Sequence, residues 1–184
     1  MAFAWTILLP GDSHSMATGP CPTLFTPRLT LRPLSLDDTD ALHQVLNDQA
    51  VWQYFPLPEV PSPIRTQTYI QGQLHHWAEY SLGHWALEDK NQILMGWGGL
   101  QFLPETNETE VAYCLGKPFW GQGYATEAAR ESLAYGFHTL HLKEIIGLTH
   151  VENKASQNVL LKIGLHLADR KTYFGMECFR FRAP

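Results

Sequence analysis

Apolar and polar residues change their spacing several times along the chain, and each change indicates a helix or a strand. Residues 28–33 (RLTLRP) alternate leucine with polar residues, which predicts a strand whose leucines face one side. Ser35, with Asp38 three residues later, has the spacing of a capping box, so we expect a helix next. The apolar face of that helix is expected to comprise Ala41, Leu42, Val45 and Leu46.

The following region predicts a proline-rich loop and a second helix. Prolines at positions 56, 58, 61 and 63 exclude a helix interior or a central strand between them. Ser62 as the N-cap and Pro63 in the first turn then begin a helix. Its expected buried stripe comprises Ile70, Leu74, Trp77 and Ala78.

Three strand-like runs come next, and their short connections predict an antiparallel meander. The runs cover residues 84–88, 93–103 and 108–115. Turn-forming residues lie between them at 89–91 and 105–107, which is the pattern of consecutive hairpins.

The last third predicts helices that alternate with strands. Helical spacing returns after Gly123, with apolar positions at Thr126, Ala129, Leu133, Phe137 and Leu140. A strand at 144–149 follows, and then a helix capped by Asn153 and ended by Gly164, with Val159, Leu160 and Ile163 on its apolar face. Strands at 165–167 and 177–182 complete the chain. Because a strand–helix–strand unit returns in the same direction, at least one pair of strands should be parallel.

Length and composition favour one folded α/β domain. The chain has 184 residues, of which 45% are hydrophobic and 17% charged, a composition too hydrophobic for a disordered protein. We expect residues 23–184 to form the domain and residues 1–22 to be a loosely ordered extension, because the latter carry one charge and several prolines. The apolar start, residues 1–10, lacks the basic segment of a signal peptide.

Charge and cysteine use limit the partners and the compartment. Thirteen basic and eighteen acidic residues give a net charge of −5, which disfavours nucleic acid as a partner. The longest apolar stretches, 7–10 and 93–100, are much shorter than the roughly 20 residues that span a bilayer, so no membrane association is expected. Three separated cysteines favour free thiols in a reducing cytoplasm. Both a monomer and a homodimer stay open.

Nine histidines raise the question of a metal site, but the sequence does not support one. The close pairs, His75 with His76 and His138 with His141, lack a matched carboxylate and third ligand at a recognisable spacing. We therefore expect no metal, and interpret the histidines as scattered residues on helix surfaces.

The most informative segment is 110–127, where a strand leads through a glycine turn into a helix. Gly121 and Gly123 allow the backbone to approach a ligand, and the free amides of a helix N-terminus attract anions, so this turn predicts a phosphate or pyrophosphate site. A tight turn with no ligand is the alternative interpretation. The dinucleotide fingerprint is excluded because Thr126 occupies its third glycine, and residues 124–126 do not supply the ending of a P-loop.

Two motifs resemble the Gcn5-related N-acetyltransferases (GNAT). They are WGQGYATEA at 120–128 and ENKASQNVLLKIGL at 152–165, in the order and spacing of that family. The opening RLTLRP at 28–33 and the helix beginning near Asp37 are similar to the branch that contains the ribosomal-protein N-terminal acetyltransferases. The resemblance covers about residues 24–181.

The resemblance implies a fold, a cosubstrate and its contacts. The expected fold is a mixed, mostly antiparallel twisted sheet flanked by helices, in which two parallel strands splay apart to hold acetyl-CoA. The turn from Gly121 to Thr126 would hold the pyrophosphate, and the strand 110–115 would pair with the pantetheine arm. The implied cofactor-binding residues are Tyr113, Cys114, Leu115, Trp120, Gly121, Gln122, Gly123, Tyr124, Ala125, Thr126, Asn153 and Ser156. Pro118, where many members carry Gln or Arg, removes a side-chain contact but not the amides, and Leu165 replaces the usual Phe.

Acetyl transfer to an amine needs a base and a group that assists the departing thiolate. Glu110 is the candidate base, because it shares a strand face with Ala112 and Cys114 and partial burial could raise the pKa of its carboxyl group. A surface glutamate is the alternative. Ser156 is the candidate hydrogen-bond donor to the thiolate, or else a first-turn residue that bonds backbone. Tyr173 is a weaker candidate acid.

The acceptor is the least constrained part of this prediction. Aromatic residues could line its pocket or belong to the core; they are Trp52, Tyr54, Phe55, Trp77, Trp85 and Trp97. The expected function is transfer of acetyl from acetyl-CoA directly to a primary amine, either a protein N-terminus or a small molecule. A catalytically inactive acyl-CoA-binding module and a nucleotide-binding enzyme are the alternatives.

Overall fold

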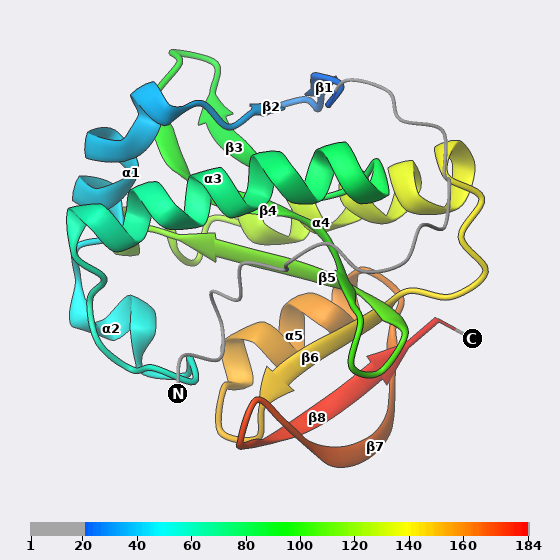
Figure 1. Cartoon of the computed structure of the whole chain (residues 1–184). Coiled ribbons are helices and arrows are strands. Elements are labelled where there is room, and N and C mark those ends of the chain that lie inside the picture. Colours follow the sequence, from blue (N-terminus) through cyan, green and yellow to red (C-terminus); the bar gives the residue numbers. More distant parts are fainter. Residues whose placement is uncertain (1–20, 184) are drawn as a thin grey trace.

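The computed structural model describes residues 21–183, and within them eight strands form one sheet in the order β1-β2-β3-β4-β5-β6-β8-β7 (Figure 1). The strands are β1 Leu24–Phe25, β2 Leu29–Pro33, β3 His84–Asp89, β4 Leu94–Leu103, β5 Glu108–Leu115, β6 Ile146–His150, β7 His166–Tyr173 and β8 Met176–Arg182. Neighbouring strands are antiparallel except β5 and β6, which are parallel. Most of the predicted extension, residues 1–20, lies outside the described residues.

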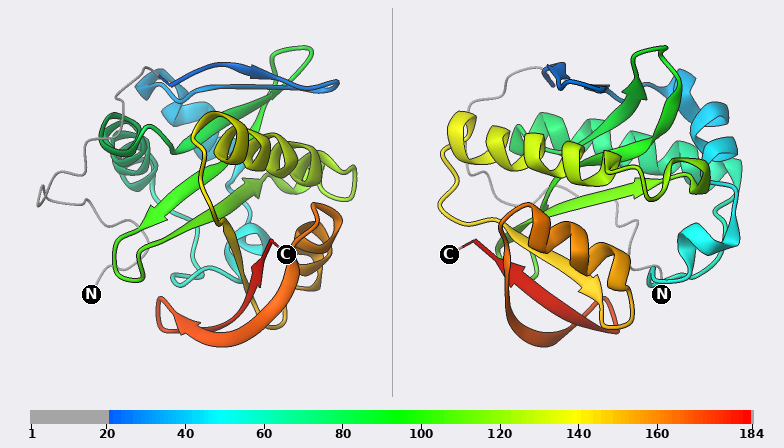
Figure 2. Two further views of the ribbon diagram at one scale, coloured as in Figure 1. Left: turned by 90° about the vertical axis from the view of Figure 1, so that its right-hand side faces the viewer. Right: turned by 180° about the vertical axis from the view of Figure 1, so that it is seen from behind.

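The helices cover both faces of the sheet (Figure 2). They are the 3₁₀ turn η1 Leu36–Asp38, α1 Thr39–Val45, α2 Gln49–Trp52, α3 Pro63–Tyr80, the 3₁₀ turn η2 Lys117–Phe119, α4 Tyr124–Ala134, the π-helical turn η3 Tyr135–Thr139, and α5 Lys154–Lys162. Alternation along β3 separates two clusters: Ala86 packs with α1, α2 and residues 69–70 of α3, whereas Trp85 and Leu87 pack with Ala128 of α4 and with Trp77 near the end of α3.

The predicted start of the first helix is confirmed, but the helical stripes differ from those expected. Ser35 and Asp38 form the capping box, with the Asp38 carboxylate accepting from the Ser35 amide at 2.8 Å. Ala41, Leu74 and Ala78, predicted as buried, are exposed. In α3, the buried positions include polar side chains that form hydrogen bonds with the backbone of the sheet. Gln73 accepts from the His84 amide at 2.8 Å, and His76 accepts from the Phe102 amide at 3.1 Å.

The C-terminal elements differ mainly in length. The helix predicted to reach Leu140 does so, but its last turn is π-helical, with the Leu140 amide bonded to the Tyr135 carbonyl at 3.1 Å. Strand β7 continues to Tyr173, well beyond the predicted 165–167, because its backbone pairs with β8. Its residues are largely exposed and polar, so the sequence contains no apolar alternation from which this length could be predicted. The short elements β1 and α2 were not predicted.

The parallel pair β5–β6 is the feature that creates the site. The two strands share one registered pair, Glu110 with Ile146, although both continue for several residues beyond it. Strands that stay paired would add further partners, so β5 and β6 diverge toward their carboxyl ends. The predicted splayed parallel pair is therefore confirmed, and it leaves one edge of β5 open.

Candidate active site

A cavity of about 760 Å³ follows the opening between β5 and β6. Its walls include residues 110–115 of β5, residues 148–150 of β6 and the first turns of α4 and α5. Residues of α2, α3 and β4 line it as well, so the cavity extends from the parallel strands to the helices α2 and α3. Twelve of the thirteen predicted site residues lie on its wall, namely Glu110, Tyr113, Cys114, Leu115, Trp120, Gly121, Gly123, Tyr124, Ala125, Thr126, Asn153 and Ser156.

The glycine turn has the geometry of an anion site. Gly121 and Gly123 adopt left-handed backbone conformations, with φ of +73° and +82°. Gly123 is the N-cap of α4, and no side chain caps the helix, so the amides of its first turn are available to a ligand. The Trp120 indole nitrogen donates to the Leu115 carbonyl at 2.7 Å and ties the turn to the end of β5. These features fit a pyrophosphate.

Gln122 is the predicted site residue that lies outside this cavity lining. It is exposed and does not line the cavity. Its side-chain amide donates to the Pro118 carbonyl at 2.9 Å, and its own carbonyl accepts from Arg28 Nη1 at 2.8 Å. Gln122 therefore contributes to the shape of the turn, and its contact with the cofactor stays a prediction.

Across the opening, β5 and α5 are connected by two hydroxyl groups. The Tyr113 phenol lies 2.9 Å from Ser156 Oγ and donates to the Ser156 carbonyl at 3.2 Å. Asn153 caps α5 by accepting from the Ser156 amide at 3.1 Å, as its position predicted. The Ser156 hydroxyl thus has the Tyr113 phenol as its partner, which holds it at the cavity wall.

Glu110 occupies the point where β5 and β6 separate. It pairs with Ile146, is partly buried, and lines the cavity together with Ala112 and Cys114. Burial, and secondarily the charge of Glu108, raises the pKa of Glu110 to about 8. This upward shift is the one expected for a carboxyl group in a confined site, and it brings titration near neutral pH.

The aromatic residues divide between the cavity and the core. Trp52, Tyr54, Phe55 and Trp97 line the cavity. Trp77 and Trp85 do not; they pack against each other in the core with ring centroids 4.8 Å apart. For these two residues the alternative interpretation, that they belong to the core, is the correct one.

Two histidines are not surface residues as predicted, but belong to the cavity wall. His76 and His84 are both buried, and burial lowers the pKa of His76 to about 4 and that of His84 to about 3. Both are therefore neutral at pH 7. The Tyr69 phenol lies 2.8 Å from Nδ1 of His84, which stacks on Trp97 with centroids 4.4 Å apart.

Tyr173, the weaker acid candidate, lies outside the cavity lining. Its phenol donates to Glu108 at 2.9 Å, and Glu108 in turn pairs with Arg180 at 2.6 Å. Burial raises the pKa of Tyr173 to about 12, with the hydrogen bond to Glu108 acting in the same direction. The structure assigns Tyr173 to an ion-pair cluster between β5, β7 and β8.

The described residues contain neither a cluster of metal ligands nor a helix that could cross a membrane. Residues 21–183 hold no group of three or more His, Cys, Asp and Glu side chains placed to bind a metal. Over the same range, no helix combines the length and the apolar character that crossing a membrane requires.

Comparison with known proteins gives the family. The profile of the Acetyltransferase (GNAT) domain matches residues 28–166. The chain belongs to the GNAT acetyltransferase family. The uncharacterized protein YkkB of Bacillus subtilis is 32% identical over 147 residues, covering 78% of this chain and 84% of the relative. The uncharacterized N-acetyltransferase p20 of Bacillus licheniformis is 29% identical, covering 75% and 79%.

Solved structures agree with this assignment. An acetyltransferase from Agrobacterium tumefaciens superposes on this GNAT chain with a TM-score of 0.77 at 26% identity, covering 94% of this chain and 99% of the other. The protein is an acetyl-CoA-dependent N-acetyltransferase. In this family, bound acetyl-CoA supplies the thioester whose acetyl group is transferred.

The raised pKa of Glu110 predicts a pH-dependent stability. A carboxyl group whose pKa rises on folding binds its proton more tightly in the folded protein, so its contribution is greatest below its ordinary pKa of about 4.5 and is lost as pH approaches about 8. Between pH 5 and pH 8, the unsubstituted chain should therefore lose more stability than Glu110→Gln. Urea unfolding of both proteins at a series of pH values measures the difference, and parallel curves would contradict it.

Proposed function

We propose that this GNAT chain transfers an acetyl group directly from acetyl-CoA to a primary amine, with Glu110 as the base. The observation that carries the proposal is the position of Glu110 on the cavity wall, at the separation of β5 and β6, with a pKa of about 8. A base with a pKa near the working pH can both accept and release a proton.

Other groups of the cavity bind acetyl-CoA and stabilise the charges that develop during the transfer. The backbone amides at the start of α4 hold the pyrophosphate, and the open edge of β5 at 113–115 holds the pantetheine arm. Glu110 takes the proton of the attacking amine, directly or through a water molecule, while the nitrogen–carbon bond forms and the carbon–sulfur bond breaks. A backbone amide of β5 stabilises the developing oxyanion. The Ser156 hydroxyl, held by Tyr113, donates a hydrogen bond to the departing thiolate sulfur.

The acceptor end of the cavity favours an amine with an apolar body. Aromatic side chains from α2, the following loop and β4 line it, together with the neutral His76 and His84. The acidic residues among the described lining of the whole cavity are Glu105 and Glu110. An aromatic, weakly charged wall suits a singly charged amine, either a protein N-terminus or a small molecule, better than a polyamine.

Two relatives have names that specify different acceptors, a polyamine and a protein. One is the spermidine N(1)-acetyltransferase of Escherichia coli, 25% identical over 73% of this chain and 70% of the relative. Another is RimL, a ribosomal L7/L12 alpha-N-protein acetyltransferase solved in complex with coenzyme A, with a TM-score of 0.70 at 19% identity. The aromatic acceptor wall leads us to place this chain nearer the second chemistry. Free thiols at Cys21, Cys114 and Cys178 support a reducing cytoplasm as its location.

Thiol release from acetyl-CoA over a panel of acceptors tests this function. The panel contains N-terminal peptides with small first residues, aromatic and alkyl monoamines, and spermidine. We expect turnover with the peptides or the monoamines and at least about tenfold lower kcat/KM with spermidine. Tight acetyl-CoA binding without turnover on any amine would favour the inactive acyl-CoA-binding alternative. Competition by adenosine phosphates in the absence of acetyl-CoA binding would favour a nucleotide enzyme.

Replacing the base should slow chemistry without weakening cosubstrate binding. Glu110→Gln keeps the shape of the side chain but cannot accept the proton, so kcat should fall about 100-fold while the Kd for acetyl-CoA stays within about twofold. Steady-state rates and isothermal titration measure the two quantities. Glu144→Gln, on an exposed residue just before β6, is the matched control and should retain the full rate. An unchanged kcat in Glu110→Gln would remove Glu110 from the mechanism.

Distorting the glycine turn should weaken the binding of CoA. Gly123 has a φ of +82°, and an added Cβ would lie 3.4 Å from Arg28 Nη2. Gly123→Val therefore strains the turn by about 1–3 kcal/mol, and the Kd for CoA should rise at least about tenfold. Gly164→Val is the control, because Gly164 has a φ of +92° in open space at the end of α5. Equal loss of CoA affinity in both variants would contradict a specific role for the turn.

A further inference from the structure

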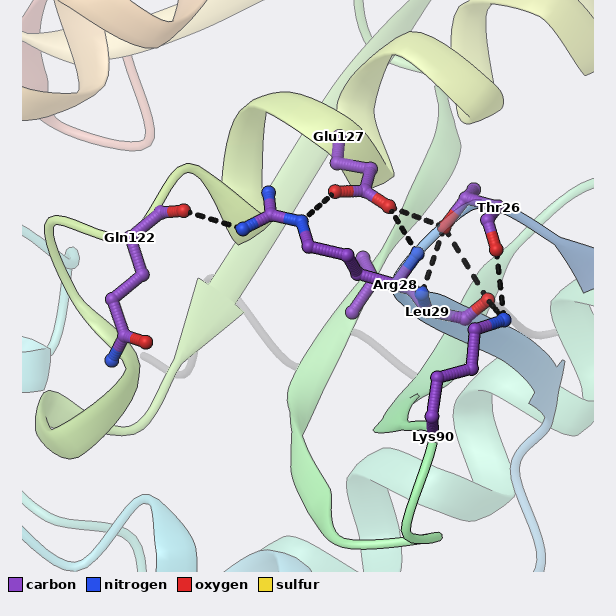
Figure 3. Close-up of polar contacts among 6 residues, drawn as sticks. All are labelled: Thr26, Arg28, Leu29, Lys90, Gln122 and Glu127. Atoms are coloured by element: carbon purple, nitrogen blue, oxygen red, sulfur yellow. Dashed lines mark hydrogen bonds and ion pairs between the residues drawn. The ribbon is translucent and has the colours of Figure 1, made fainter.

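Figure 3 shows that one carboxylate at the start of α4 is held by a segment almost a hundred residues earlier in the chain. Glu127 Oε2 accepts from Arg28 Nε at 2.6 Å. Its other oxygen, Oε1, accepts from the Arg28 amide at 2.8 Å and from the Thr26 hydroxyl at 2.7 Å. The short connection between β1 and β2 is thereby joined to the first turns of α4.

The same arginine also contacts the glycine turn on both sides of Gly123. Its Nη1 donates to the Gln122 carbonyl at 2.8 Å, and its guanidinium lies 4.6 Å from the centre of the Tyr124 ring. A turn with left-handed glycines at 121 and 123 loses much backbone freedom when it is fixed in one conformation. Contacts that fix it beforehand reduce the entropy lost on binding a ligand.

The position of Glu127 adds an electrostatic reason. Its negative charge lies one turn into a helix whose N-terminus is the proposed phosphate site, where an unpaired carboxylate would repel the ligand. Burial would raise the pKa of Glu127, but hydrogen bonds from Thr26 and Arg28 outweigh burial and hold it below its ordinary value. The carboxylate is therefore ionised, and the guanidinium of Arg28 neutralises it locally.

The connecting segment is itself held from its other side. Lys90, in the turn after β3, donates to the Thr26 carbonyl at 2.8 Å and to the Leu29 carbonyl at 3.3 Å (Figure 3). Arg28 thus extends from a backbone that is fixed by β2 and by Lys90. An anchored arginine can position the turn, whereas one on a loose end would move with it.

We propose that Arg28 is a positioning residue for the phosphate-binding turn: it holds the Gln122 carbonyl and the Glu127 carboxylate so that the first amides of α4 face the pyrophosphate of acetyl-CoA. This inference rests on the proposed function only in assigning that turn to the pyrophosphate. It gives a role in cosubstrate affinity to a residue that does not line the cavity.

The test compares ligands that reach the turn with one that does not. Arg28→Met removes the charge and both hydrogen bonds, so the Kd for CoA and the KM for acetyl-CoA should rise about tenfold with kcat changed less than about twofold. S-acetylpantetheine lacks the phosphates, so its kcat/KM should be unchanged. Arg28→Lys retains the charge beside Glu127 and should recover part of the CoA affinity. Arg65→Met, which breaks the exposed pair with Glu59 at 2.7 Å, is the matched control and should bind CoA normally.

The outcomes separate this role from a general structural one. CoA affinity unchanged in Arg28→Met, or an equal loss with S-acetylpantetheine, overturns the positioning role. Should Arg28→Met not fold, Arg28→Lys must still raise the Kd for CoA in calorimetry, and a normal Kd there overturns the proposal. An unsubstituted chain that does not bind CoA overturns the proposed function, and this inference with it.

Discussion

The candidate site depends on one feature of the sheet: the parallel strands β5 and β6 diverge after the pair formed by Glu110 and Ile146. Parallel strands normally satisfy each other's backbone groups along their length, so their separation leaves donors and acceptors on β5 without a strand partner. The cavity occupies that opening, and the helix that connects the two strands begins with the glycine turn at its rim. The candidate base, the open strand edge and the candidate anion site thus all lie along this one opening.

The charge distribution is organised around the same point. A chain of net charge −5 has no general attraction for a polyanionic cosubstrate, so the attraction has to be local. In the site we propose, the amides at the N-terminus of α4 supply this attraction, and Arg28 forms an ion pair with the carboxylate of Glu127 beside them. At the other end of the cavity, burial keeps His76 and His84 neutral at pH 7, and the pKa of Glu110, about 8, places its titration near neutral pH.

Local signals were predicted well wherever a few consecutive residues decide the structure. The capping box at Ser35 and Asp38, the Asn153 cap and the left-handed Gly164 depend on near neighbours, and all three are present. Burial was predicted less well where a distant partner decides it. Gln73 and His76 are buried because they bond strand backbone, which displaces Leu74 to the surface, and β7 is a strand because β8 pairs with it.

The sequence by itself determined the order of the longer elements, the glycine turn and the family, because periodicity and the motifs at 120–128 and 152–165 are local patterns of chemistry and spacing. Only the tertiary structure decided which aromatic residues face the cavity, that Tyr113 reaches Ser156, and that Arg28 reaches Glu127. It also set the pKa of Glu110, since burial and the charge of Glu108 exist only in the folded chain. Contacts between residues far apart in sequence have no short-range signature, and they are the contacts that shape this site.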